Sequence, residues 1–308
     1  MDDAPMPATE DFTSRAYESE TDYDQMRRLL VESLARTGLP VYATIGNLDW
    51  WRVAEDDPRS IYQTQLWFDG LGRLVAFAWP IEGQVDILVH PDYPHLHATA
   101  LAWSEAYFRE QSAEGEAVPW VAWAFTRAAA RIAALAARGY RRTERGLVLY
   151  TQPVPHPAPP PVLPAGYTIR AVQGVAEGEK RAAVQRAAFE STWMTAERHD
   201  RVRNSPTYRP ELDIVVVAPD GEFAAFALLW YDEVNRLGVF EPLGVSVAYQ
   251  RLGLGRAVIA EGLRRLAALG ARVACVETGI EHQPARRLYE ATGFTLLDVD
   301  YAWQLLAG

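Results

Sequence analysis

The chain has a single cysteine and fewer basic than acidic residues. Because Cys275 is the one thiol, no disulfide can form within the chain, and a reducing compartment suits it. The 30 lysines and arginines are outnumbered by 40 aspartates and glutamates, which gives a net charge of −10. This charge repels nucleic acid and anionic membranes at long range, so we expect neither as a partner.

Long apolar runs and a leader-like start are also missing. No run approaches the roughly 18 apolar residues of a membrane helix. The opening MDDAPMPATEDF has acids and prolines where a signal peptide has a basic region and then an apolar one. With 49% hydrophobic and 23% charged residues, the composition is typical of a globular protein, and we expect it in the cytoplasm.

Several chemical signatures are absent as well. The chain has neither the glycine-rich loop with Lys-Ser/Thr of a nucleotide P-loop nor the GxGxxG of a dinucleotide site. His90, His95 and His97 lie close in sequence, but no pattern of carboxylates or cysteines accompanies them, so no metal site is predicted. Cys275 lies in RVACVET, which is typical of a buried strand and not of a nucleophile.

Proline, by contrast, is concentrated at the middle of the chain. The segment TQPVPHPAPPPVLPAG favours an extended, semi-rigid linker. On both sides of it, short patterns recur in the same order: Arg-Ala pairs, Asp-Gly turns between apolar strands, and Gly139 or Gly293 just after a helix. We therefore predict two copies of one α+β domain, at 1–150 and 166–308, joined by a linker at 151–165.

The second copy contains a strand that runs into two closely spaced glycines and then a long helix. In AYQRLGLGRAVIA, Gly253 and Gly255 precede a helical stripe of Val258, Ile259 and Leu263. A helix N-terminus presents unpaired N–H groups, and glycines allow an anion to approach them closely. The stretch alone is equally compatible with a simple turn.

Two motifs together resemble those of the GNAT superfamily of acyl-CoA-dependent N-acyltransferases. QRLGLG matches the family's Q/R-x-x-G-x-G/A signature, and RRLYEATGF resembles its later helix with a Leu-Tyr pair and a Gly-Phe ending. The resemblance covers residues 166–308 and, more loosely, the first half. It implies two tandem GNAT-like domains, each with a mixed, mostly antiparallel sheet, a splayed fourth strand and flanking helices.

The resemblance also implies a site for acetyl-CoA as cosubstrate. The strand end would bind the pantetheine arm, and the loop would bind the pyrophosphate. His282 stands where the family often has an asparagine, so its contact with the cofactor and a role as an exposed loop histidine both stay open. The implied cofactor-binding residues are Val245, Ser246, Val247, Gln250, Arg251, Leu252, Gly253, Leu254, Gly255, Arg256 and His282.

Two catalytic residues follow from the same resemblance. Tyr289 matches the tyrosine that protonates the departing thiolate, and a core packing role is its alternative. Glu241, on the fourth strand, is the candidate general base, with Asp232 and Glu233 as weaker alternatives. The implied reaction is direct attack by a small-molecule amine in a ternary complex. A non-catalytic acyl-CoA sensor or scaffold is the competing hypothesis, and the oligomeric state, a homodimer included, is left open.

The first copy lacks the residues that carry this chemistry. His97 and Thr99 stand at the positions of Gly253 and Gly255, and Leu135 stands at that of Tyr289. Side chains at the two glycine positions would block an approaching phosphate. We therefore predict that the first domain is a degenerate copy, which kept the fold and lost the cofactor.

Overall fold

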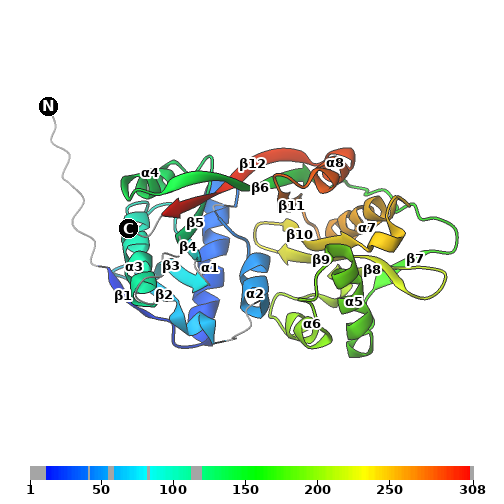
Figure 1. The fold of residues 1–308 in the computed structure, drawn as a ribbon, viewed down its shortest axis with the longest axis horizontal. Coiled ribbons are helices and arrows are strands. Elements are labelled where there is room, and N and C mark those ends of the chain that lie inside the picture. The colour runs from blue at the N-terminus through cyan, green and yellow to red at the C-terminus, as the bar shows by residue number, and fades with distance from the viewer. Residues whose placement is uncertain (1–11, 41, 55–58, 82–83, 112–119, 306–308) are drawn as a thin grey trace. The chain divides into compact units, whose positions relative to one another are not determined.

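The computed structural model describes residues 12–40, 42–54, 59–81, 84–111 and 120–305. The N-terminal stretch in which no signal peptide was recognised lies almost wholly outside these residues. No described helix is long and apolar enough to cross a membrane. The secondary structure is α+β, as predicted (Figure 1).

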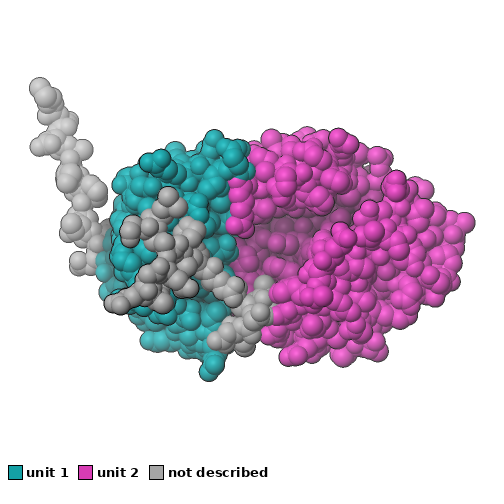
Figure 2. Space-filling view, in the orientation of Figure 1, with its two compact units in different colours: residues 1–43, 57–144, 301–308 teal, residues 44–56, 145–300 magenta. Residues whose placement is uncertain are grey.

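The chain forms two compact units, coloured teal and magenta in Figure 2. Unit 1 comprises Met1–Ala43, Asp57–Glu144 and Tyr301–Gly308, and unit 2 comprises Thr44–Asp56 and Arg145–Asp300. These units differ from the predicted 1–150 and 166–308 division in three respects. A segment of the first half, Thr44–Asp56, belongs to unit 2, and a segment near the end of the second half belongs to unit 1. Unit 2 also begins its long segment at Arg145, so residues 145–165 belong to it.

Unit 1 contains a sheet with one parallel pair among antiparallel ones. The strand order is β1-β2-β3-β4-β5-β12, and only β4 and β5 run parallel among the register pairs determined for this unit. Its elements are β1 (Thr13–Ala16), α1 (Glu20–Thr37), η1 (Ser60–Gln63), β2 (Gln65–Phe68), β3 (Leu74–Ile81), β4 (Gln84–Val89), α3 (Leu96–Gln111), β5 (Trp120–Phe125) and α4 (Ala129–Ala137), with the end of β12 (Thr295–Leu305).

Unit 2 repeats this arrangement with strand order β6-β11-β10-β9-β8-β7. Only β10 and β11 run parallel among its determined pairs. Its elements are α2 (Ile45–Ala54), β6 (Arg141–Pro153), β7 (Thr168–Ala171), η2 (Val175–Glu177), α5 (Gly178–Phe189), α6 (Ala196–Arg203), η3 (Pro210–Leu212), β8 (Asp213–Val217), β9 (Phe223–Asp232), β10 (Leu237–Val245), η4 (Val247–Tyr249), α7 (Leu254–Ala268), β11 (Val273–Gly279) and α8 (Gln283–Ala291).

Each sheet takes one strand from the opposite half of the sequence. β6 follows α4 in the chain but pairs antiparallel with β11, while β12 follows α8 and lies beside β5. β6 continues to Pro153, so the first residues of the proline-rich segment form strand and not linker. Sequence proximity therefore does not define the units, because the final strands of the two halves are exchanged.

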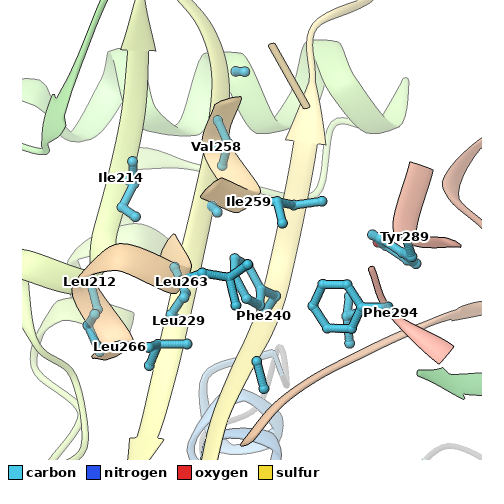
Figure 3. Packing of buried hydrophobic residues seen from close by; sticks show 14 of the residues in the cluster. Leu212, Ile214, Leu229, Phe240, Val258, Ile259, Leu263, Leu266, Tyr289 and Phe294 are labelled. Atoms are coloured by element: carbon cyan, nitrogen blue, oxygen red, sulfur yellow. The ribbon is translucent and has the colours of Figure 1, made fainter. Parts of the chain in front are cut away.

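The core of unit 2 lies between α7 and the central strands. The predicted stripe of α7 is buried, and Val258, Leu263 and Leu266 pack in one cluster with Leu229 of β9 and Phe240 of β10 (Figure 3). The helix comes unusually close to the sheet at Gly262, where a Cβ would lie 2.4 Å from Phe240 Cε1. This packing fixes the N-terminus of α7 relative to the end of β10.

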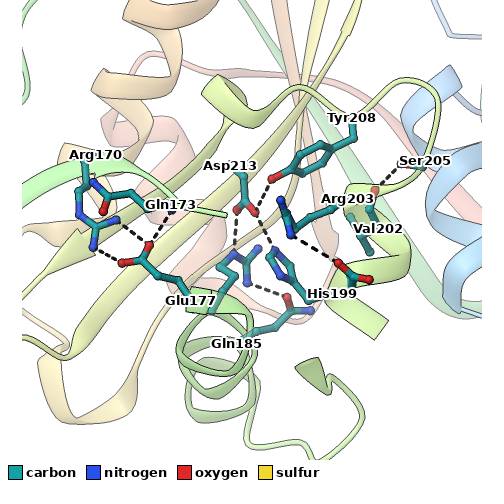
Figure 4. Close-up of polar contacts among 12 residues, drawn as sticks. Arg170, Gln173, Glu177, Gln185, His199, Val202, Arg203, Ser205, Tyr208 and Asp213 are labelled. Atoms are coloured by element: carbon teal, nitrogen blue, oxygen red, sulfur yellow. Dashed lines mark hydrogen bonds and ion pairs between the residues drawn. The ribbon is translucent and has the colours of Figure 1, made fainter. Parts of the chain in front are cut away.

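A buried ion-pair cluster joins α5 and α6 to the first residue of β8 (Figure 4). Arg181 Nε donates to Asp213 Oδ1 at 2.8 Å, and His199 Nε2 lies 2.8 Å from Asp213 Oδ2. Tyr208 adds a hydroxyl hydrogen bond at 3.2 Å. Burial raises the pKa of Asp213, but the charge of Arg181 and the bond to His199 outweigh it and hold the pKa below its usual value.

Candidate acyl-CoA and acceptor site

β10 separates from β11 halfway along its length. The two strands pair in parallel from Leu237 to Phe240, whereas β11 continues to Gly279 paired with β6. At the point of separation the register between β10 and β9 shifts, and Glu241 and Pro242 form the irregularity. The predicted splayed fourth strand is thus confirmed, with a gap that begins at Glu241.

The backbone of β10 beyond the bulge points its free groups into this gap. Ser246 N–H donates to Ala224 O of β9 at 2.9 Å, which makes that pair a hydrogen-bonded one. In an antiparallel ladder the neighbouring residue faces the other way. The N–H and C=O of Val245 therefore point away from β9, as do those of Leu243, toward the space that β11 has left.

A cavity of about 860 Å³ occupies the gap. Ten of the predicted residues line it: Glu241, Val245, Gln250, Arg251, Gly253, Leu254, Gly255, Arg256, His282 and Tyr289. Ser246, Val247 and Leu252 do not; Ser246 is buried, and the Val247 and Leu252 side chains are largely exposed. The structure thus brings the loop, the strand end and α8 together around one space.

The two glycines of the loop have different physical roles. Gly253 has φ +80°, immediately before α7, and a Cβ there would meet no atom within 4 Å. A Cβ at Gly255 would lie 2.9 Å from Leu288 Cδ2, so this glycine lets α8 approach α7. Gly253 leaves open space in front of the first N–H groups of α7, and Arg251 and Arg256 add positive charge beside it.

Glu241 is a half-buried carboxyl at the base of the gap, and it lines the cavity. Burial, and to a lesser extent the charge of Glu277, raise the pKa of Glu241 to about 8. Its backbone carbonyl accepts a 2.7 Å hydrogen bond from the indole N–H of Trp230, and its Oε2 accepts one from the amide of Asn47. A carboxylate with a pKa near 8 is suited to take a proton from an amine.

Tyr289 lies in α8 and lines the same cavity. The side chain is 4% exposed, and its ring packs near those of Tyr150 and Phe294. Burial, together with the charge of Glu241, raises the pKa of Tyr289 above its usual value. The phenol is therefore neutral and able to donate a proton, and its hydroxyl makes no hydrogen bond to another described residue.

The alternative residues lie away from the cavity. Asp232 accepts hydrogen bonds from Asn235, and Glu233 pairs with Arg209. Neither side chain lines the gap, whereas His282 does and contacts Thr278 Oγ1 at 3.3 Å through Nδ1. Cys275 is buried in β11, as its sequence context predicts.

Sequence reasoning missed Asn47 and Glu277. Glu277 follows the parallel pairing of β11 with β10, which places it beside Glu241 at the start of the gap. Asn47 comes from α2, in the half of the sequence assigned to the other domain. No local pattern identifies either residue, because both reach the site through tertiary structure.

The corresponding region of unit 1 is smaller and partly filled. β4 pairs with β5 only at Gln84 and Val85, and the cavity beyond has about 290 Å³. Arg131 of α4 donates to the carbonyl of Ile87 on β4, and its guanidinium lies 4.3 Å from the centre of the Tyr42 ring. A side chain thus uses backbone that is free in unit 2. No cluster suited to a metal ion occurs among the described residues.

Comparison with known proteins identifies the class. Residues 181–294 match the family model described as the acetyltransferase (GNAT) family. A GCN5-related N-acetyltransferase from Sphaerobacter thermophilus aligns with 96% of this chain and 95% of its own, at 20% identity and TM-score 0.68. A tandem GNAT protein from the clavulanic acid biosynthesis pathway aligns with 97% of this chain and 99% of its own, at 17% identity and TM-score 0.66. The tandem fold is therefore shown over the whole chain.

Two curated proteins that are similar in sequence are both named mycothiol acetyltransferase. The protein of that name from Streptomyces griseus is 31% identical over 148 residues, which are 47% of this chain and 48% of the relative. The one from Frankia alni is 32% identical over 192 residues, 56% of this chain and 57% of the relative. The aligned regions thus span about half the length of these curated relatives.

Proposed function

We propose that unit 2 transfers an acetyl group from acetyl-CoA to the amine of a small molecule. The observation that carries the proposal is that Glu241 and Tyr289 line one cavity, which opens where β10 leaves β11. A proton acceptor and a proton donor are the two groups that aminolysis of a thioester needs. The match of residues 181–294 to the GNAT family supports the same reaction.

The residues present fit acetyl-CoA. The free backbone groups of Leu243 and Val245 suit the amides of the pantetheine arm, and the loop before α7 suits the pyrophosphate. Arg251 and Arg256 supply charge at that end. When bound, acetyl-CoA supplies the acetyl thioester, and the apolar walls of the cavity limit its exposure to water.

The proposed chemistry balances with two protein groups. Glu241 takes a proton from the acceptor ammonium, directly or through water, and the neutral amine then forms a C–N bond with the acetyl carbon. The C–S bond breaks, and Tyr289 supplies the proton that the leaving sulfur requires. The nitrogen loses its second proton as the amide forms, and this proton restores the Tyr289 hydroxyl. Backbone N–H groups at the bulge are placed to stabilise negative charge on the carbonyl oxygen.

Calorimetry with acetyl-CoA tests the site. We expect Gly253→Glu to weaken binding about a hundredfold, because the new carboxylate faces the phosphates. Gly270→Glu is a matched control: Gly270 has φ +84°, a Cβ there meets nothing within 4 Å, and it follows the opposite end of α7. Equal affinity in both variants, or no binding by the unmodified protein, contradicts the proposal.

The acceptor is tested with an amine panel that reports release of free CoA thiol. Because the relatives in sequence are named mycothiol acetyltransferases, the panel includes the amine that acetylation converts into mycothiol. The neighbouring carboxyl groups of Glu241 and Glu277, which both line the cavity, favour an acceptor that arrives as a cation. Binding of acetyl-CoA without turnover of any amine would support the sensor hypothesis.

A further inference from the structure

α2 lies directly against Trp230 of β9, the side chain that bonds to the backbone of Glu241. A Cβ at Gly46 would lie 2.3 Å from Cγ of Trp230, so the helix backbone contacts the indole. The same indole donates its N–H to the backbone carbonyl of Glu241 at 2.7 Å. α2 and Glu241 are therefore held by one buried side chain.

The start of α2 fixes the orientation of the Asn47 amide. Thr44 N–H and Thr44 Oγ1 donate to Asn47 Oδ1 at 2.8 and 2.7 Å, and Asn47 N–H contacts Thr44 Oγ1 at 3.3 Å. This is a capping box, in which the first and fourth residues satisfy each other's polar groups. Since Oδ1 is engaged by two donors, the amide nitrogen is directed at Glu241 Oε2, to which it donates.

We propose that Asn47 is a positioning residue for acetyl transfer, which orients the Glu241 carboxylate and favours its deprotonated form. The inference rests on the proposed function in that Glu241 is taken as the base. It adds a residue that neither the family motifs nor the predicted domain boundaries include.

The hydrogen bond from Asn47 matters because the other groups around Glu241 disfavour its charged form. The charge of Glu277 of β11 raises the pKa of Glu241, and the charge of Glu241 in turn raises that of Tyr289 of α8. α5 contributes the apolar Ala188 and Phe189 to the same cavity. Among the described residues, Asn47 is the one donor to its carboxylate. Burial and Glu277 disfavour the charged form, and the Asn47 amide opposes them.

The decisive variant is Asn47→Asp. It is isosteric and keeps an oxygen for Thr44, so α2 retains its cap, but it replaces the donor with a second carboxyl. We expect the pKa of Glu241 to rise by about one to two units above its value near 8. The acid limb of the kcat/KM profile should move by the same amount. Asn47→Ala should shift both in the same direction.

Two readouts separate this inference from the function on which it rests. The pKa of Glu241 is measured without substrate, by a pH titration of ¹³C-labelled glutamate carboxyls in the full chain, with Glu241→Gln assigning the resonance. The pH profile is measured with any accepted amine. If no amine reacts, the proposed function fails, while the titration still decides whether Asn47 controls the protonation of Glu241.

Thr44→Val is the structural control. It removes the hydroxyl from the cap but leaves the backbone N–H of Thr44 and the Asn47–Glu241 bond in place. We expect a lower unfolding midpoint with an unchanged Glu241 pKa. The inference is overturned if Asn47→Asp and Asn47→Ala leave that pKa unchanged, or if Thr44→Val shifts it as far as they do.

Discussion

The hydroxyl of Tyr289 can supply a proton because its surroundings keep it neutral. Burial and the charge of Glu241 both raise its pKa, so the phenol stays protonated at physiological pH. We expect Tyr289→Phe to lower kcat about a hundredfold, since it removes one proton donor, and to leave acetyl-CoA affinity nearly unchanged. Steady-state turnover together with calorimetry measures the two effects separately.

Tyr150→Phe is the matched control for that variant. The Tyr150 ring lies 5.9 Å from that of Tyr289, but its hydroxyl bonds to Glu290, and Tyr150 does not line the cavity. Its loss should lower stability and leave kcat unaltered. Full turnover by Tyr289→Phe would show that the tyrosine is only a packing residue.

The pH dependence of turnover follows from Glu241. Its pKa is raised to about 8, so it is mostly protonated at neutral pH, and the base becomes available as the pH rises through that value. We expect kcat/KM to rise with an apparent pKa near 8 and Glu241→Gln to lose this limb along with at least a hundredfold in rate. Glu233→Gln, which alters an exposed pair with Arg209, should keep the profile. A profile flat between pH 6 and 9 in the unmodified protein would argue against this base.

At the residue scale, the sequence predicts what local chemistry determines. The loop glycines, Tyr289 and Glu241 lie within recognisable motifs or on a recognisable strand, and the structure brings them to one cavity. Asn47 is 194 residues away from Glu241 in the chain, and no spacing rule links them. Val247 and Leu252 were included because they lie inside the motif, yet the direction of a side chain depends on the local backbone.

At the scale of elements, Asp213 holds α5 and α6 to β8. Arg181, Asp213 and His199 are all at most 1% exposed, so removal of the carboxylate leaves a buried guanidinium without its ion partner. We expect Asp213→Asn to lower the free energy of unfolding by about 3–5 kcal/mol. Urea unfolding at pH 7, followed by circular dichroism, measures this difference.

The pH dependence of that loss has a fixed sign. The folded pKa of Asp213 lies below the ordinary value of 3.8, so its contribution is present above that value and disappears as the pH falls through the folded pKa. The two proteins should therefore converge in acid. Glu222→Gln removes an exposed pair with Lys180 and should cost about 1 kcal/mol or less. A similar small loss for Asp213→Asn would mean that the cluster adds little to stability.

Helices and hairpins were predictable where glycine and turn chemistry set their limits. Gly38, Gly139 and Gly293 adopt positive φ after helices, and the Asp-Gly turns connect β2 to β3 and β8 to β9. That α2 packs in unit 2 was not predictable in this way. It depends on the fit of Gly46 against Trp230, which only the folded unit creates.

At the scale of the whole molecule, the exchange of β6 and β12 makes each half depend on the other. We expect the chain, when cut between Ala158 and Pro159, to keep its native elution volume in size-exclusion chromatography, because β6 remains paired with β11 across the cut. The pieces expressed separately should be insoluble, since β11 then has an unpaired edge.

The same cut combined with Val148→Pro tests whether the pairing of β6 with β11 holds the two pieces together. Val148 pairs with Thr278, one pair from the Gly279 end of the β6–β11 ladder, and proline removes a donor there. We expect this protein to separate into its pieces or precipitate after cleavage. Independent folding of residues 159–308 alone would instead favour the division into domains that the repeat suggests.

The exchange of β6 and β12 also determines the order in which the two sheets can be completed during synthesis. β5 emerges from the ribosome early, but its neighbour β12 is synthesised after every other described strand. Until then β5 has an open edge, a form of exposure that favours aggregation in newly made chains. The half of the protein that is translated first is thus the half whose sheet is completed last.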